Sequence, residues 1–316
     1  MTGRIWLFPI LAAALAIIAL ASCEDATGSV GDDDDTSDGG GTDGDADGDT
    51  DADGDTDSDG DTDSDGDTDA DGDGDGCSEA AKSIYLVDSN NSFYRFYPPD
   101  KQLVKVGVLD CKAGGAQPFS MAVARDGTAY VLFSNSMSTC AGIYAVNTET
   151  AECVEKTPFA CGFGLFGMGY ATNGATTTDE TLYIGKAGTA ANGQLGRLDT
   201  STWKMTPIGP TAASPEFTGN ALGELWGFFP KSKKIAQIDK SSGAEIATWP
   251  LSLDTNANAW AFAHWGGSYY IFYKTATQAS TFIYQVTDGK MTTYMPKTGT
   301  TIVGAGVSTC APVVPE

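Results

Sequence analysis

The sequence is poor in the residues and motifs that most catalytic sites use. His264 is the only histidine among 316 residues, and the seven cysteines include no CxxC pair. These absences argue against a zinc site built from cysteine and histidine. The sequence also has no GxSxG elbow, no P-loop and no GxGxxG segment after a strand, which argues against the common hydrolase and nucleotide-binding folds.

Basic residues are missing from one long acidic segment. Residues 24–76 hold 24 Asp or Glu and no Lys or Arg, whereas residues 77–316 carry 18 acidic and 17 basic residues. The net charge of -24 therefore belongs to one segment, and the remaining chain is nearly neutral and long enough for a sizeable core. It contains no basic stripe, which argues against nucleic-acid binding.

The acidic segment contains a short repeat. Asp49 to Gly72 is four copies of a DTDADG or DTDSDG unit, which matches the opening of an EF-hand loop. Position 12 counted from Asp55 is Gly66 rather than Glu, however, and no apolar helix flanks the repeats. Thrombospondin-type calcium repeats are similar in composition, but their later aspartates and cysteines are missing here. A defined calcium site is therefore not expected.

The acidic segment has little to bury. No apolar residue larger than Ala occurs between Gly31 and Gly76, so burial cannot offset the entropy of ordering the chain. We expect residues 23–76 to form a disordered, self-repelling linker with an r.m.s. span of roughly 40 Å. Weak, diffuse Ca²⁺ binding by its aspartates is the one cofactor interaction that this composition suggests.

The first 23 residues have the layout of an export signal. Arg4 precedes an apolar run from Ile5 to Ala21, which is short for a membrane span. The segment Leu20-Ala21-Ser22-Cys23 resembles the lipobox of bacterial lipoproteins. The resemblance implies a signal peptide over residues 1–22 and a Cys23 that carries fatty-acyl chains such as palmitate and becomes the new N-terminus. The protein would then be lipid-anchored in the cell membrane or outer membrane; an uncleaved anchor or an ordinary signal peptide is the alternative, and is also extracytoplasmic.

The cysteine count fits an exported chain. Without Cys23 an even number remains, which suggests three disulfide bonds. The six are Cys77, Cys111, Cys140, Cys153, Cys161 and Cys310.

From Ser83 onward the chain alternates short runs of β-branched and aromatic residues with Gly, Asn, Asp and Pro turns, which predicts an all-β domain. A strand of small residues recurs at steps of 47, 51, 43 and 42 residues. An aromatic-bearing strand follows each of the first four, and the segment around Tyr85 supplies the partner that the fifth lacks. The small-residue strands begin at Phe119, Phe166, Phe217, Trp260 and Ile302.

Four strands per unit at a period in the forties is the signature of a β-propeller. The chain resembles the propeller superfamily in general, without a WD dipeptide or a Kelch double glycine. We therefore predict a five-bladed β-propeller over residues 77–316. One blade is shared by the N- and C-terminal strands, which removes the open sheet edges.

This topology suggests the disulfide pairs. Cys77 and Cys310 lie on either side of the joint between the chain ends, so their bond would lock the ring. Cys140 and Cys161 fall nearly opposite each other across the hairpin of residues 142–158. Cys111–Cys153 follows by elimination.

The predicted channel offers little for catalysis. We expect His264, on an inner strand, to be structural because it has no second histidine beside it. Glycosidase propellers need two or three carboxylates on inner strands. Here the inner strands carry none before their turns, and Asp126 and Glu224 lie at the far ends. Lactonase-like and quinone-dependent propellers need several acids and amides, and Asn220 is the single candidate. We predict no catalytic residue and no metal ligand.

The large apolar residues that open the inner strands are the best candidates for a binding site. Together they could ring one mouth of the channel and form an apolar ligand platform. They could equally pack between blades, as every propeller requires. The five are Phe119, Phe166, Phe217, Trp260 and Ile302.

The sequence predicts a monomeric, membrane-anchored lipoprotein whose propeller binds or scaffolds an unknown protein or glycan without catalysis. The alternative is an extracytoplasmic propeller hydrolase or lyase, which requires at least two carboxylates, or His264 with an acid, to converge in the channel. A third hypothesis is a purely structural envelope component, which would show no concave site.

Overall fold

The computed structural model describes residues 77–316 apart from residues 137–138, 188–192 and 255. The predicted signal peptide, Cys23 and the acidic linker lie outside the described residues. In the described part, no helix is long and apolar enough to cross a membrane. The helices there are two short 3₁₀ turns, η1 (Glu79–Lys82) and η2 (Pro98–Asp100).

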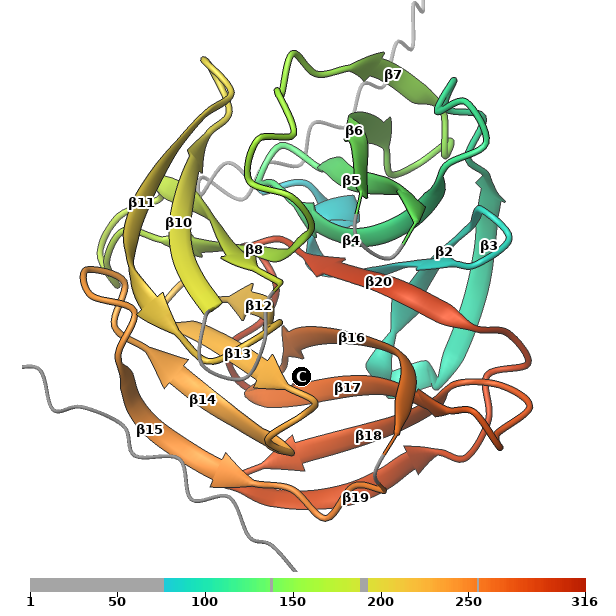
Figure 1. The fold of residues 1–316 in the computed structure, drawn as a ribbon. Coiled ribbons are helices and arrows are strands. Elements are labelled where there is room, and N and C mark those ends of the chain that lie inside the picture. Colours follow the sequence, from blue (N-terminus) through green and yellow to red (C-terminus); the bar gives the residue numbers. More distant parts are fainter. Residues whose placement is uncertain (1–76, 137–138, 188–192, 255) are drawn as a thin grey trace, which may run out of the picture. The chain divides into compact units, whose positions relative to one another are not determined.

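The described strands form five antiparallel sheets of four strands each, arranged around a common axis as the blades of a propeller (Figure 1). From inner to outer strand, the first blade consists of β20 (Ile302–Val307), β1 (Ile84–Asp88), β2 (Ser92–Tyr97) and β3 (Gln102–Val108). The second consists of β4 (Gln117–Val123), β5 (Thr128–Ser136), β6 (Thr139–Asn147) and β7 (Cys153–Lys156). The third consists of β8 (Phe166–Thr172), β9 (Glu180–Lys186), β10 (Gly193–Asp199) and β11 (Lys204–Thr211). The fourth consists of β12 (Glu216–Gly219), β13 (Leu225–Phe229), β14 (Lys234–Ile238) and β15 (Glu245–Pro250). The fifth consists of β16 (Ala257–Trp265), β17 (Ser268–Thr275), β18 (Phe282–Thr287) and β19 (Lys290–Met295).

The inner strands close the ring. Each of β20, β4, β8 and β12 contacts the inner strand that follows, and β16 contacts β20. The innermost strand of the first blade comes from the C-terminus, whereas its other three strands come from the N-terminal end of the domain (Figure 1). The predicted five-bladed propeller with a shared blade is therefore confirmed.

The small residues of the inner strands allow this close packing. A Cβ atom on Gly169 of β8 would lie 2.5 Å from the backbone oxygen of Phe217 on β12. A Cβ on Gly219 of β12 would lie 2.3 Å from the backbone oxygen of Tyr170. Neighbouring inner strands thus touch backbone to backbone, which only residues without a side chain permit. Further out, aromatic side chains fill the space between blades, as where Phe96 meets Phe272 at 6.0 Å between ring centroids.

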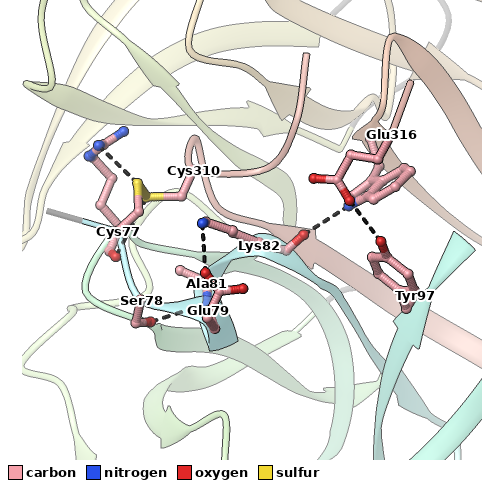
Figure 2. Close-up of polar contacts among 10 residues, drawn as sticks. Cys77, Ser78, Glu79, Ala81, Lys82, Tyr97, Cys310 and Glu316 are labelled. Atoms are coloured by element: carbon pink, nitrogen blue, oxygen red, sulfur yellow. Dashed lines mark hydrogen bonds and ion pairs between the residues drawn. A yellow bond between two sulfur atoms is a disulfide. The ribbon is translucent and has the colours of Figure 1, made fainter. Parts of the chain in front are cut away.

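Three disulfides brace the ring. Cys77 is bonded to Cys310, 233 residues away, at the joint between the two chain ends (Figure 2). Cys111–Cys153 and Cys140–Cys161 are the other two bonds. These are the three pairs to which the sequence analysis points.

Hydrogen bonds add to the joint beside the Cys77–Cys310 bond. The indole nitrogen of Trp265 donates to the backbone oxygen of Lys82 at 2.8 Å, and the Tyr97 hydroxyl donates to the Glu316 carboxylate at 2.7 Å (Figure 2). The Arg125 guanidinium lies 3.1 Å from the sulfur of Cys77. The first and last described residues are therefore tied to the ring by covalent and polar contacts at once.

Candidate functional site

A hollow opens at the end of the ring where the inner strands begin, and we call it the Trp260 hollow. It has three compartments of 460, 350 and 170 Å³, and Trp260 lines all of them. Every inner strand contributes to the wall of at least one compartment. The contributing residues are Phe119 of β4, Gly167 of β8, Glu216 of β12, Trp260 of β16 and Val303 of β20.

Backbone bulges direct side chains into this hollow. The register of β4 shifts between Pro118 and Ser120, that of β16 between Ala257 and Ala259, and that of β20 at Ile302 and Gly304. The extra residue of each bulge lines the hollow: Phe119, Asn258 and Val303 respectively. Bulges re-aim side chains and are frequent beside binding sites. The three irregular inner strands thus supply much of the smallest compartment.

Two aromatic faces form the apolar part of the wall. Phe119 and Trp260 are both half-buried, so each packs on one side and faces the hollow on the other. Phe119 packs against the cluster between the second and third blades, and Trp260 against the cluster between the fourth and fifth. Phe163, from the loop before β8, adds a third ring to the largest compartment. A concave wall with rigid aromatic faces is typical of ligand sites.

Glu216 lies at the base of the hollow, at the start of β12. The Ser120 hydroxyl donates to its carboxyl at 2.8 Å and accepts from the backbone nitrogen of Met168 at 3.2 Å. Burial raises the pKa of Glu216 well above the ordinary value for a glutamate. The carboxyl is therefore held neutral at acidic pH, in a form that can donate a hydrogen bond.

Lysines supply the charge at the edge of the hollow. Lys186 lines the largest compartment, Lys233 lines another, and Lys231 lines both. The Lys186 ammonium lies 5.4 Å from the centre of the Phe163 ring, a cation–π contact that keeps it beside the largest compartment. Among the described residues that line the three compartments, Glu216 is the only one with a carboxyl group. The hollow is therefore apolar on its walls and cationic at its edge.

The five apolar residues of the predicted platform do not form a ring. Phe119 and Trp260 line the hollow together. Phe166, Phe217 and Ile302 are completely or almost completely buried in clusters between blades. The alternative of packing between blades therefore holds for these three. No bulge turns them outward, because β8 and β12 pair with β9 and β13 without a register shift and the bulge of β20 follows Ile302.

The expectation that inner strands carry no carboxylate was wrong. The third small-residue strand was predicted to begin at Phe217, whereas β12 begins one residue earlier, at Glu216. A shift of one residue moves a side chain to the other face of a strand. The one sequence feature that could have revealed this carboxylate is its position, since Glu216 directly precedes the small-residue strand.

His264 has no part in the hollow. It lies on β16 with 4% of its surface exposed, its ring packs edge-on against Tyr269, and its Nδ1 is buried without a hydrogen-bond partner. Burial lowers its pKa from 6.5 to about 4, so the ring is neutral at physiological pH. No carboxylate is hydrogen-bonded to it within the described residues, and so the requirement for His264 paired with an acid is not met there.

The other predicted polar candidates shape turns. Asn220 accepts from the backbone nitrogens of Leu222 and Glu224, and its amide donates to the Glu224 carboxylate at 2.9 Å. Asp126 accepts from the backbone nitrogen of Thr128 in the turn between β4 and β5. Both lie at the opposite end of the ring from the Trp260 hollow. No cluster of three or more potential metal-ligating residues occurs in the part of the chain that the structure describes.

A second hollow of 590 Å³ lies near the joint between the chain ends. Several of its polar groups pair with one another: Lys82 pairs with Glu79 at 2.7 Å, and Tyr97 donates to Glu316 (Figure 2). Tyr85 donates to the backbone oxygen of Ala80 in the same wall. This hollow is part of the closure of the ring.

No protein-family description matches the chain, and no curated protein matches it in sequence. A solved protein of unknown function from Bacteroides caccae is 10% identical over 71% of this chain and 97% of its own, with a TM-score of 0.42. A nidogen/laminin complex gives 9% identity over 71% and 97%, with a TM-score of 0.43. The calcium-binding protein regucalcin from Agrobacterium tumefaciens gives 11% over 64% and 68%, with a TM-score of 0.40. These likenesses concern the fold alone.

Proposed function

We propose that this protein is a monomeric, lipid-anchored lipoprotein of the bacterial cell envelope whose propeller binds a protein or glycan without catalysis. The observation that carries the proposal is the Trp260 hollow: two half-buried aromatic faces, a lysine edge and one buried carboxyl group whose pKa is raised. Ligand sites in proteins combine apolar walls with a few directed polar groups in this way. Hydrolysis by the glycosidase route would need a second carboxylate beside Glu216.

The envelope location rests on two features. Three disulfides fit an oxidising compartment outside the cytoplasm. The Leu20 to Cys23 segment supports acylation at Cys23 as the anchor. The acidic segment that separates Cys23 from Cys77 would then hold the propeller away from the membrane as a soluble, extended spacer.

The proposal is tested by binding and by recovery of the ligand. The full-length protein and its Trp260→Ala variant are incubated on arrays of envelope-type glycans and of peptides. We expect at least one ligand that the wild type retains and the variant does not, and we expect mass spectrometry to recover that ligand uncleaved. A cleaved ligand would instead support the hydrolase or lyase. Retention that is the same in both proteins would rule out the hollow as the site.

A further inference from the structure

The two ends of the propeller differ in charge. The end that holds the Trp260 hollow is formed by the starts of the inner and third strands and by the loops that precede them. Its exposed or half-exposed lysines include Lys112, Lys156, Lys186, Lys231, Lys233 and Lys297. The fully exposed carboxylates at that end, within the described residues, are Asp110, Asp254 and Glu155, which directly precedes Lys156. The hollow therefore opens into a positively charged surface.

The opposite end is acidic. Its turns carry, among others, Asp126, Glu149, Asp179, Asp199, Asp239 and Asp288. Lysines such as Lys101 and Lys290 lie there too, but carboxylates outnumber them. The near-zero net charge of residues 77–316 thus hides a separation of charge along the axis of the ring. A cleft surrounded by one sign of charge concentrates ligands of the other sign.

We propose that the Trp260 hollow binds an anionic saccharide, a chain of sugar rings that bear carboxylates. This inference rests on the proposed binding function and specifies its ligand. The aromatic faces of Trp260 and Phe119 offer flat apolar surfaces on which the C–H face of a sugar ring can lie. Lys186 and Lys233 stand at the edge, where carboxylates on neighbouring rings would meet them.

Glu216 completes the recognition. Its buried carboxyl group is hydrogen-bonded to Ser120 and lines the two compartments that contain Phe119. In its neutral form the carboxyl donates a hydrogen bond to a ligand hydroxyl or carboxylate and adds no repulsive charge. An ionised glutamate at the same place would repel an anion. The hollow therefore combines two features suited to an anion: cations at the edge and, below the raised pKa of Glu216, an uncharged acid at the base.

The chain's own acidic segment is a poorer occupant than a saccharide. It carries the charge that the lysines attract, but no apolar residue larger than Ala lies between Gly31 and Gly76. It has nothing to place on the faces of Phe119 and Trp260. An acidic peptide without aromatic or aliphatic side chains has the same deficiency.

The test uses the full-length protein in calcium-free buffer and three probes of equal length: a galacturonic acid octamer, a galactose octamer and an octa-aspartate peptide. Titration calorimetry measures each affinity at 50 and 200 mM NaCl. We expect the galacturonic acid octamer to bind at least tenfold more tightly than either of the others. Its affinity should fall as salt rises, because the lysines at the edge are screened.

Two variants locate the site. Trp260→Ala should weaken binding of the galacturonic acid octamer at least tenfold, and the Lys186→Gln/Lys233→Gln pair about fivefold. The matched control is Lys105→Gln/Lys290→Gln, which removes the same charge away from the hollow and should change the affinity less than twofold. If Trp260→Ala does not fold, the Lys186→Gln/Lys233→Gln variant still tests the site, because both lysine side chains lie at the edge of the hollow.

The results separate this inference from the proposed function. Equal binding of the galactose octamer, lost in Trp260→Ala, would overturn the anionic preference and leave the hollow as a binding site. If octa-aspartate bound as tightly as the galacturonic acid octamer, the hollow would recognise charge alone and the preference for a saccharide would be overturned. Binding that appears only at 200 mM NaCl would show that the acidic segment occupies the hollow. If no variant of the hollow changes any binding, the proposed function fails as well.

Discussion

The hydroxyl of Ser120 on β4 donates a 2.8 Å hydrogen bond to the carboxyl of Glu216 on β12, although the blade of β8 stands between theirs. The same oxygen accepts from the backbone nitrogen of Met168 on β8. One buried hydroxyl therefore joins the inner strands of three successive blades directly beneath the Trp260 hollow. A polar link of this kind fixes the spacing of the strands that form the site, and its strength depends on the charge of Glu216.

Replacing Glu216 by Gln should make the stability of the protein less dependent on pH. The native pKa of Glu216 is raised by burial, so its neutral form stabilises the fold fully below about pH 4.5. That stabilisation is lost as the pH rises through the native pKa, at about 1.4 kcal/mol per pH unit. Glu216→Gln keeps the hydrogen bond with Ser120 and cannot ionise. Its free energy of unfolding relative to wild type should therefore increase from pH 5 to pH 8.

Urea denaturation of both proteins at pH 5, 6, 7 and 8 measures this difference. Because Glu180 and His264 titrate in both proteins, subtraction removes their contributions. A difference that does not change with pH would show that Glu216 is ionised in the native protein across that range.

His264 should limit stability on the acidic side. Its pKa is lowered from 6.5 to about 4 because the ring is buried. The neutral ring stabilises the fold above pH 6.5, and this contribution is lost as the pH falls towards 4. His264→Phe should remove the loss, since the ring packs against Tyr269 and its Nδ1 has no hydrogen-bond partner to forfeit. The backbone nitrogen of residue 264 would keep its bond to Thr218.

Thermal melting at pH 4, 5, 6 and 7 tests this prediction. The wild type should lose about 3 kcal/mol more than His264→Phe between pH 6.5 and pH 4, as the lowered pKa implies. Melting temperatures that fall in parallel would show that other groups cause the acid sensitivity.

The fold was predictable because its signals repeat along the chain. Each blade supplies a small-residue strand followed by an aromatic one, and the partner missing after Ile302 is present around Tyr85. The disulfide between Cys77 and Cys310 follows from that closure. A repeat of this kind is recognised from the presence and order of the strands. An error of one residue in where a strand begins or ends does not change it.

The site was only partly predictable because it depends on single-residue register. Phe166 and Ile302 open their strands and are buried, whereas Phe119 occupies a bulge and faces the hollow. A bulge depends on the pairing of two strands and leaves no distinct mark in the sequence of one. Glu216 was missed for a related reason, since its strand begins one residue earlier than Phe217.

Inserting one methyl group between two inner strands should destabilise the ring. A Cβ on residue 169 would lie 2.5 Å from the backbone oxygen of Phe217, and backbone cannot move aside without separating β8 from β12. Gly169→Ala should therefore lower the free energy of unfolding by about 3 kcal/mol. Gly174→Ala is the matched control, because its Cβ would have no neighbour nearer than 3.9 Å. Equal urea midpoints for the two variants would contradict the close packing of these strands.

Acylation at Cys23 is open to a direct measurement. The lipobox-like segment predicts that the mature chain begins at Cys23 and carries fatty-acyl chains. Intact mass spectrometry of the protein from its native host should show that start and the added acyl mass. The mass should also rise by about two hydrogens for each of the three disulfides on reduction. An unprocessed Met1 would contradict the lipid anchor and the proposed location together.

The Cys77–Cys310 bond should contribute more to stability than either of the others, because it closes the longest loop. In the chain-entropy account the unfolded state loses more freedom when the joined residues are further apart, and the separations here are 233 residues for Cys77–Cys310 and 21 for Cys140–Cys161. These loops correspond to upper figures of about 5 and about 3 kcal/mol. We therefore expect Cys77→Ser/Cys310→Ser to lower the free energy of urea unfolding more than Cys140→Ser/Cys161→Ser does. The paired substitutions leave no unpaired thiol in either protein. If the two variants lost equal stability, or the second lost more, the joint between the chain ends would be held mainly by its hydrogen bonds, such as that from Trp265 to Lys82, rather than by the disulfide.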